Sequence, residues 1–213
     1  MALILQYASV NFLIFFLEFS SFLFLMRYAL RVEVLELYKE AGGYLEGHFL
    51  LASGRHSPKF LQSTTVMQYT DKAEAIGQAI AEKFDEVPDF VIGPAMGGVT
   101  LAFVVARALG CRAIFAEKDG AGGMTIREAF EIKEDERFIA VEDVVTTGGS
   151  LLKAISAVEA AGAQCHGIGC IIDRRSDEQR EALEMRSLTT LQFPTYEADN
   201  CPLCDAGITL EDV

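Results

Sequence analysis

The segment FIAVEDVVTTGGS, residues 138–150, places two acids, Glu142 and Asp143, directly before a turn of hydroxyl and glycine residues. Small residues let backbone N–H groups approach a bound anion closely, and a helix that starts after the turn adds free N–H groups and a favourable dipole. The turn therefore favours phosphate binding, and the alternative is a Ser-capped helix that begins at Ser150. The two acids, however, would repel a phosphate bound beside them.

Three interpretations of Glu142 and Asp143 remain open from the residues alone: solvated acids at a strand end, Mg²⁺ ligands, or acceptors for two vicinal hydroxyls. The third interpretation removes the conflict, because a ribose phosphate carries its diol and its phosphate at opposite ends. The acids would accept from the 2′- and 3′-hydroxyls while the turn holds the 5-phosphate. The sequence contains neither a G-x-x-x-x-G-K-[ST] loop nor a G-x-G-x-x-G after its first strand, so nucleotide sites of those kinds are not supported.

Length, charge and cysteine content narrow the class of protein. A chain of 213 residues fits one domain with a substantial core. A formal net charge of −13 argues against a nucleic-acid partner, although local basic residues could still bind a small anion. The five cysteines are odd in number and have no framework spacing, which predicts a reducing compartment and a cytoplasmic protein.

Residues 1–25 are almost wholly apolar and differ from the rest of the chain. The apolar run is long enough to cross a bilayer, but Glu18 lies near its middle and no basic residue precedes it. We interpret it as an apolar extension with three open alternatives: a misassigned start before Met26, a membrane anchor or a folded extension. Membrane contact is expected only if this segment is translated and inserted. Residues 26–213 are expected to form the functional domain.

Beyond Arg31 the apolar residues follow helical spacing or form short continuous runs, which predicts a doubly wound α/β domain with a parallel sheet. Helices are expected at 30–42, 71–84 with Asp71 as cap, 98–110, 150–162 and 177–186. Extended segments are expected at 48–54, 59–67, 89–93, 111–117, 138–141, 166–173 and, as the last strand, 188–193. Ligands of such sheets bind at the carboxyl ends of the strands, which here are the polar, glycine-containing segments 93–98, 116–123, 142–150 and 173–177.

The segment VEDVVTTGGS resembles the signature with which type I phosphoribosyltransferases bind phosphoribosyl pyrophosphate. Further segments are similar to orotate phosphoribosyltransferases, over roughly Val34 to Leu210: GHFLLASGRHSPKF (47–60), VIGPAMGGVTLA (91–102), MTIREAFEI (124–132), CIIDRR (170–175) and PTYEADNCPLC (194–204). The resemblance implies the fold of that family, a doubly wound parallel sheet with a small N-terminal hood over the base.

The resemblance also implies a role for each matching residue. The ribose diol and 5-phosphate of the donor would be held by Glu142, Asp143, Val144, Val145, Thr146, Thr147, Gly148, Gly149 and Ser150. Pyrophosphate would be received by the backbone of Ala95, Met96, Gly97 and Gly98. Orotate would be contacted by Thr146 and Arg174, with Arg174 binding the carboxylate of orotate. In the hood, orotate would be contacted by Ser53, Gly54 and Phe60.

The implied reaction displaces pyrophosphate from C1′ of phosphoribosyl pyrophosphate by N1 of orotate, with Mg²⁺ bound mainly through the donor. Catalysis is then expected from Lys118 and Asp143, with Lys118 acting across the interface of a homodimer that shares its active sites. The loop that follows Lys118 is shorter and less basic than in the best-known relatives, with Glu117 where an arginine is common, so Arg127 is the only other basic candidate there. The hood likewise has Ala52, and the pyrophosphate loop has Met96-Gly97, where many relatives carry a lysine.

Two alternatives share the ribose-phosphate motif: a phosphoribosyltransferase for another base, and a non-catalytic regulator that senses phosphoribosyl pyrophosphate. The hood segment and Arg174 favour a carboxylated pyrimidine over another base. A separate motif, Cys201-Pro-Leu-Cys204, could be half of a zinc site, but the sequence has no second C-x-x-C and the histidines lie far away in sequence. No metal ligands are therefore predicted.

Overall fold

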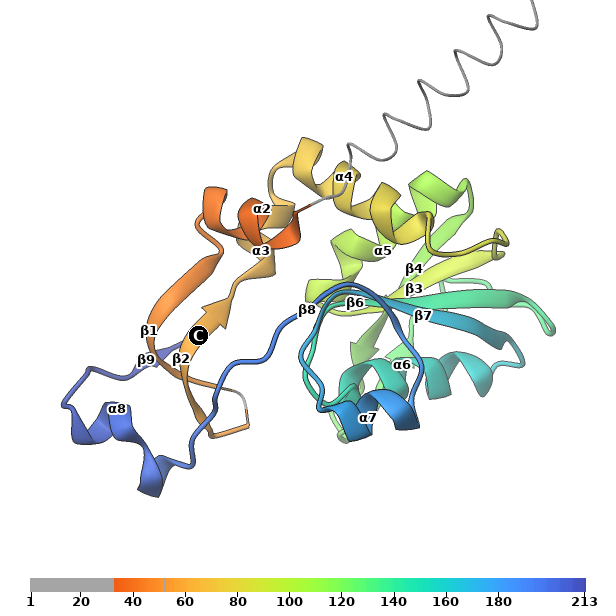
Figure 1. The fold of residues 1–213 in the computed structure, drawn as a ribbon. Helices are drawn as coiled ribbons and strands as arrows, with labels where there is room; N and C mark the ends of the chain where they lie inside the picture. The colour runs from red at the N-terminus through yellow and green to blue at the C-terminus, as the bar shows by residue number, and fades with distance from the viewer. Residues whose placement is uncertain (1–32, 52) are drawn as a thin grey trace, which may run out of the picture. The chain divides into compact units, whose positions relative to one another are not determined.

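A six-stranded sheet forms the core of the computed structural model, which describes residues 33–51 and 53–213 (Figure 1). The strand order is β5-β4-β3-β6-β7-β8, and every neighbouring pair is parallel except β4 and β5. The strands are β3 (Phe90–Pro94), β4 (Arg112–Lys118), β5 (Met124–Ile126), β6 (Arg137–Val145), β7 (Gln164–Asp173) and β8 (Arg186–Thr190). The prediction of a parallel α/β sheet is confirmed, and the short antiparallel β5 was not predicted.

Helices cover both faces of this sheet, as the doubly wound prediction requires. Figure 1 shows α4 (Thr70–Ala81) and α5 (Gly97–Leu109) on one face, and α6 (Gly149–Glu159) with α7 (Asp177–Ala182) on the other. The strand bodies are buried from both sides, and Phe90 of β3 stacks on Phe138 of β6 with ring centroids 5.4 Å apart. Such double burial is what continuous apolar strands predict.

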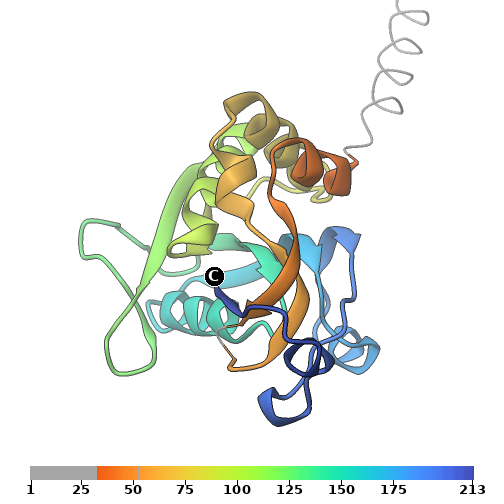
Figure 2. The same cartoon turned by 90° about the vertical axis from the view of Figure 1, so that its left-hand side faces the viewer.

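A second, three-stranded sheet forms the hood, which we define as the hairpin of β1 (Tyr44–Leu50) and β2 (His56–Leu61) together with β9 (Glu211–Asp212). The hairpin is antiparallel, and β9 adds a parallel edge beside β1, where the end of the chain meets the hairpin (Figure 2). Two short helices, α2 (Val34–Glu40) and α3 (Ser63–Met67), flank the hairpin in sequence, and a turn η1 (Ala198–Asn200) and helix α8 (Pro202–Asp205) precede β9.

Some expected elements differ from those observed. The β-branched run at 63–67 was predicted to be extended, but it forms α3, which buries Ser63, Val66 and Met67; the Ser63 hydroxyl lies 2.8 Å from the Tyr38 hydroxyl. Asp71 does not cap α4, whose N-cap is Tyr69 without a side-chain bond. Strand β6 continues through Glu142 and Asp143 to Val145. Helix α7 ends four residues earlier than predicted, and β8 begins at Arg186. The last strand is β9 rather than β8.

The predictions made for residues 1–25 lie outside the described residues. Among residues 33–51 and 53–213, no helix has the length and apolar character needed to span a membrane.

Candidate active site

The carboxyl ends of β3, β4, β6 and β7 lie along one edge of the sheet, so the four polar segments predicted to converge there do so. Two backbone hydrogen bonds fix the loops at this edge. The N–H of Ala95 donates to the carbonyl of Ala116 at 2.7 Å, and the N–H of Arg174 donates to the carbonyl of Val145 at 2.8 Å. The second bond places Arg174 beside the residue that precedes Thr146, so the two predicted orotate contacts are neighbours in space.

Asp143 faces the predicted pyrophosphate loop, residues 95–98. Successive side chains of a strand point to opposite faces, so Asp143 and Glu142 on β6 face different surroundings. A Cβ atom added to Gly97 would lie 2.8 Å from Oδ1 of Asp143, which shows how closely this carboxylate approaches the backbone of the loop. Glycine at position 97 leaves room for the Asp143 carboxylate in this position. In the same loop, the peptide between Ala95 and Met96 is cis.

Glu142 lies in an environment that disfavours its charge. Burial, and secondarily the negative charge of Asp143, raises the pKa of Glu142 to about 8. In the absence of a ligand, Glu142 is therefore largely protonated at neutral pH. A protonated carboxyl and a neighbouring carboxylate together offer both a donor and acceptors, which suits a pair of hydroxyl groups.

The predicted phosphate turn is open to solvent and ends in a helix N-terminus. Gly148, with φ of 79°, is the N-cap of α6 and makes no side-chain cap bond, so the alternative of a Ser-capped helix is wrong. The N–H of Gly149 makes only a long bond of 3.4 Å to the Thr147 hydroxyl. Thr146, Thr147 and Ser150 are exposed, while Val145 is buried and anchors the turn to the sheet. The free N–H groups and hydroxyls here can all donate to an anion.

Arg174 is a partly buried cation without a carboxylate partner among the described residues. Its guanidinium lies 4.8 Å from the centre of the Phe193 ring, and its Nε atom is buried without a hydrogen-bond partner in the described part of the chain. Burial lowers the pKa of Arg174 below its usual value, although a guanidinium remains charged at any physiological pH. A buried donor left unpaired is costly, so this side chain fits a ligand that brings an acceptor.

Arg175, the next residue along the chain, is instead fully paired within the protein. Its Nε and Nη2 atoms donate to the two carboxylate oxygens of Asp173 at 3.0 and 2.9 Å, and Nη1 donates to the carbonyl of Leu183 at 2.7 Å. Burial alone would raise the pKa of Asp173, but the hydrogen bonds from Arg175 hold it below its usual value. The family resemblance had selected Arg174 as the orotate contact, and the packing shows that its neighbour Arg175 is already paired.

The hood residues predicted to contact the base are placed less tightly. Phe60 is partly buried on β2, with its ring centre 6.0 Å from that of Phe49, and Ser53 and Gly54 form the exposed hairpin turn. A residue that sequence reasoning missed is Lys59, whose Nζ lies 5.5 Å from the centre of the Phe193 ring that also carries Arg174. Its position directly before Phe60 in the hood segment was the available signal.

The two basic residues predicted to act from the β4–β5 loop, Lys118 and Arg127, have different surroundings. Lys118 ends β4, is exposed, and makes no ion pair within residues 33–51 and 53–213. Arg127 instead pairs with Glu117 and lies 5.5 Å from the centre of the Phe115 ring. Between them, Asp119 folds the short loop by accepting from the N–H groups of Ala121 and Gly123 at 2.7 and 2.9 Å. Lys118 is therefore the cation at this hairpin that is available to a ligand.

A groove of about 360 Å³ lies between the β4–β5 hairpin and α6. It is lined by Gly123, Met124, Leu152, Lys153, Ser156 and Ala157, none of which is a predicted site residue. The predicted site is the open edge of the sheet rather than this groove, because the anion-binding turn, Asp143 and Arg174 all lie at that edge.

Known proteins that are similar to this chain belong to one family. Residues 65–198 match the phosphoribosyl transferase domain family. The chain is 54% identical over 183 residues to an orotate phosphoribosyltransferase of Thermus thermophilus, covering 85% of this chain and 100% of that protein. It is 52% identical over 181 residues to the orotate phosphoribosyltransferase of Deinococcus radiodurans, covering 81% of this chain and 93% of that one.

Solved structures show the same fold at lower identity. The crystal structure of orotate phosphoribosyltransferase from Aeropyrum pernix aligns with a TM-score of 0.63 and 24% identity, over 73% of this chain and 92% of that one. The Mycobacterium tuberculosis orotate phosphoribosyltransferase in complex with phosphoribosyl pyrophosphate aligns with a TM-score of 0.58 and 24% identity, over 76% and 96% of the two chains.

Proposed function

The chain belongs to the orotate phosphoribosyltransferase family, and from this premise we propose that it converts orotate and phosphoribosyl pyrophosphate to orotidine 5′-phosphate and pyrophosphate, a step of pyrimidine nucleotide synthesis. One observation carries the choice of orotate. The partly buried guanidinium of Arg174, whose Nε atom has no hydrogen-bond partner among the described residues, lies at the same sheet edge as the open anion turn that begins at Thr146. A carboxylated base and a phosphate supply the two anions that this edge lacks.

The donor is held by the segment that starts at Glu142. Glu142 and Asp143 accept the ribose hydroxyls, and the turn from Thr146 to Ser150 binds the 5-phosphate through N–H and hydroxyl groups. Val144 and Val145 contribute backbone. The acids and the phosphate therefore meet opposite ends of one sugar. Pyrophosphate lies against the backbone of residues 95–98, where Asp143 already approaches Gly97.

In the reaction, N1 of orotate loses its proton and forms a bond to C1′ as the bond from C1′ to the pyrophosphate oxygen breaks. The electron pair of the broken bond leaves with pyrophosphate, which also takes up the proton. Positive charge develops on the ribose ring and negative charge on the leaving group. No covalent enzyme intermediate is required, so positioning and charge stabilisation supply the catalysis. Thr146 and Arg174 orient orotate, while the hood, through Phe60 and the turn at Ser53-Gly54, covers the base.

Mg²⁺ is part of the proposal as an ion carried by the donor. The oxygen donors of Asp143 suit a hard cation, and the carboxylate faces the loop proposed to receive pyrophosphate. When bound, the ion would neutralise part of the leaving group's charge. The remaining neutralisation falls to Lys118, whereas Arg127 contributes less because Glu117 already pairs with it.

We further propose a homodimer in which Lys118 of one subunit serves the active site of the other. Support comes from its position: it is exposed at the end of a protruding hairpin and makes no ion pair within the described part of its own chain. A cytoplasmic location belongs to the same proposal and is supported by five cysteines that are all free.

The test follows the loss of orotate absorbance with phosphoribosyl pyrophosphate and Mg²⁺. Arg174→Lys keeps the charge but loses the fork that grips a carboxylate, so KM for orotate should rise about 10- to 100-fold, as expected for losing one charged hydrogen bond. KM for phosphoribosyl pyrophosphate should change little. Arg107→Lys, at the surface ion pair with Glu74, is the matched control and should behave as wild type.

Two results would contradict the proposal. Turnover with a different base and none with orotate would identify a transferase of other specificity. Saturable binding of phosphoribosyl pyrophosphate without turnover of any base would identify the sensing regulator instead.

A further inference from the structure

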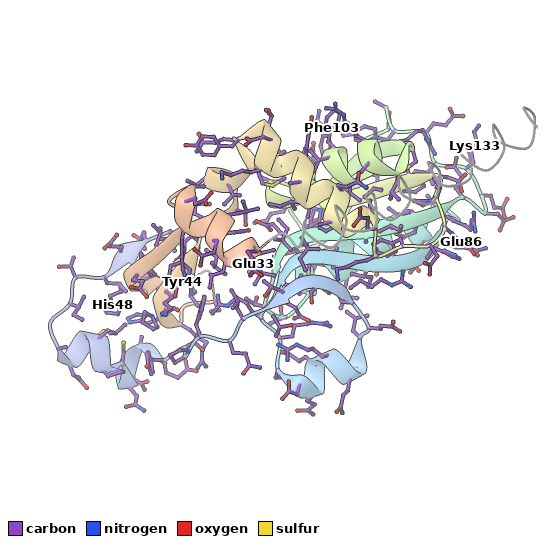
Figure 3. All side chains as sticks on the ribbon, turned by 45° about the horizontal axis from the view of Figure 1, so that its top comes forward. Glu33, Tyr44, His48, Glu86, Phe103 and Lys133 are labelled. Carbon is purple, nitrogen blue, oxygen red and sulfur yellow. The ribbon has the colours of Figure 1, made fainter. Side chains whose placement is uncertain are left out.

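Four side chains with metal-ligating atoms meet at the hood, and none of them is a residue of the proposed active site. His48 on β1, His56 at the start of β2, Cys201 and Cys204 each offer one atom, and these atoms all lie within 4.8 Å of one another. Figure 3 labels His48, which projects from the hood beside the C-terminal segment. The prediction of no metal ligands rested on the distance between these residues in sequence, and the fold removes that distance.

The separations fit a tetrahedron of two nitrogen and two sulfur atoms. Cys201 Sγ lies 3.6 Å and Cys204 Sγ 3.8 Å from His48 Nε2, and Cys204 Sγ lies 3.4 Å from His56 Nδ1. A tetrahedral Zn²⁺ site with ordinary Zn–N and Zn–S bonds has edges of about 3.3–3.8 Å between its ligand atoms. The distance from His48 Nε2 to His56 Nδ1 is 2.9 Å, and it needs to increase by only a few tenths of an ångström.

The surroundings of His48 also prepare it as a ligand. Its Nδ1 lies 2.8 Å from the carbonyl oxygen of Ile208, which can only accept, so Nδ1 carries the proton and Nε2 presents its lone pair to the cluster. A backbone carbonyl that fixes the tautomer of a ligating histidine is the usual outer partner in zinc sites. His48, His56 and Cys201 are 1%, 5% and 2% exposed, which excludes water from three sides of the cluster.

We propose that His48, His56, Cys201 and Cys204 bind one Zn²⁺ ion as a structural site. Two thiolates and two neutral imidazoles are a donor set that zinc prefers, and four protein ligands close the coordination sphere, as structural sites do. The two thiols release their protons when the ion binds, and the resulting charge of the site is zero. The ion joins the β1–β2 hairpin to residues 201–208 and so holds the end of the chain on the hood.

The hood needs such a clip because its own sheet is small. Only two residues of β9 pair with β1. The polar links between the tail and the hairpin are also few, and they include the His56–Tyr196 backbone bridge, the bonds from Arg55 to Thr195 and Glu197, and the His48–Ile208 bond. Small units with little core are commonly stabilised by a metal. All four ligands lie outside residues 65–198, the part shared with the phosphoribosyl transferase domain family. None of the four is a residue of the proposed active site.

The first test measures metal in the full chain, expressed with added zinc and purified with a phosphine reductant and no chelator. Elemental analysis should find about one Zn²⁺ per chain, as expected for a closed four-ligand site. Replacement by Co²⁺ should give the visible bands of tetrahedral cobalt together with thiolate charge-transfer absorption. A reduced, folded chain that takes up neither zinc nor cobalt would overturn the proposal.

Variants then assign the ion to these residues. Loss of a residue that only supports a metal ligand typically weakens metal binding by about 10- to 100-fold. Cys204→Ser removes a ligand itself, the exposed one, so it should weaken Zn²⁺ binding by more than that. Cys165→Ser is the matched control, since Cys165 lies on β7 away from the hood, and it should keep the full metal content. Wild-type affinity in Cys204→Ser would contradict the assignment.

A rescue variant keeps the test decisive if Cys204→Ser folds poorly. Cys204→His restores a ligand with one thiolate fewer, so zinc should be retained and the thiolate-to-cobalt absorption should fall to about half. Unchanged cobalt absorption in Cys204→His would place the metal elsewhere. Removing zinc from the wild type with a strong chelator should also lower Tm and expose the segment around Tyr196 to protease. Neither measurement depends on orotate turnover.

Discussion

Arg174 and Arg175 are neighbours in the chain, yet one is left available for a ligand and the other is fully committed. Arg175 satisfies Asp173 and two carbonyls, whereas Arg174 rests on Phe193 with a buried Nε atom unpaired among the described residues. Both residues follow the end of β7, and only Arg175 turns back onto Asp173. Arg175 thus fixes the backbone from which Arg174, the proposed contact to orotate, extends.

The raised pKa of Glu142 predicts how the stability of the folded protein depends on pH. The folded protein binds a proton on Glu142 at pH values where the unfolded chain does not, since its pKa rises from 4.5 to about 8 on folding. Stability of the ligand-free protein should therefore fall as pH rises through that window and level off above it. Glu142→Gln, a neutral mimic of the protonated acid, should lose this fall. Thermal unfolding across the window measures it, with the exposed Glu36→Gln as control; parallel curves for wild type and Glu142→Gln would contradict it.

Gly97 gives a second prediction at this scale. A Cβ at Gly97 would press on Asp143, so Gly97→Ala should lower kcat/KM for phosphoribosyl pyrophosphate by about 10-fold or more, by displacing that carboxylate. If the effect passes through Asp143, adding Gly97→Ala to Asp143→Asn should cost little further. Fully additive losses in this double-mutant cycle would show that the two residues act separately.

At the scale of elements, α7 depends on a buried ion pair rather than on its own apolar face. The helix buries none of its residues, and it is held by its Ser176–Gln179 capping box and by Arg175, which reaches the carbonyls of Gln179 and Leu183. Asp173 at the end of β7 anchors that arginine. The strand end and the helix are therefore one cooperative unit beside the active site.

Removing Arg175 should consequently be far more costly than removing a surface arginine. Arg175→Ala leaves the carboxylate of Asp173 buried with only the more distant Arg180, so the free energy of unfolding should fall by about 3–5 kcal/mol. Arg107→Ala breaks an exposed pair and should cost about 1 kcal/mol or less. Urea unfolding monitored by circular dichroism compares the two. A loss for Arg175→Ala no larger than for Arg107→Ala would show that the pair is not structurally important.

At the scale of the whole molecule, the sequence predicted best what depends on neighbouring residues. Apolar runs and helical spacing located the sheet, and the parallel topology then brought the four polar strand ends to one edge. Contacts between distant segments escaped prediction. Cys201 meets His48 across 153 residues, and Phe193 joins Lys59 to Arg174, and no local pattern encodes either contact. Segment 63–67 was misassigned because packing outweighed the strand preference of its β-branched residues.

The proposed shared active site can be tested by mixing two inactive variants. Lys118→Ala and Asp143→Asn should each have little activity alone. If Lys118 acts on the partner's site, subunit exchange creates mixed dimers with one intact site, and about a quarter of wild-type activity should return. Sedimentation confirms that the subunits are dimers and circular dichroism that both variants are folded. No recovery after exchange would assign Lys118 to its own subunit or deny it a role.

The pairing of β9 with β1 has a consequence for synthesis of the protein. The β1–β2 hairpin leaves the ribosome about 150 residues before its partners at 195–212, and translation proceeds at about 5–20 residues per second. For those seconds β1 has an open edge, and His48 and His56 have no cysteines beside them. The sheet domain can assemble as it emerges, but the lid over the base can close only after residues 195–212 have emerged. The nascent chain therefore acquires its substrate cover after its sheet.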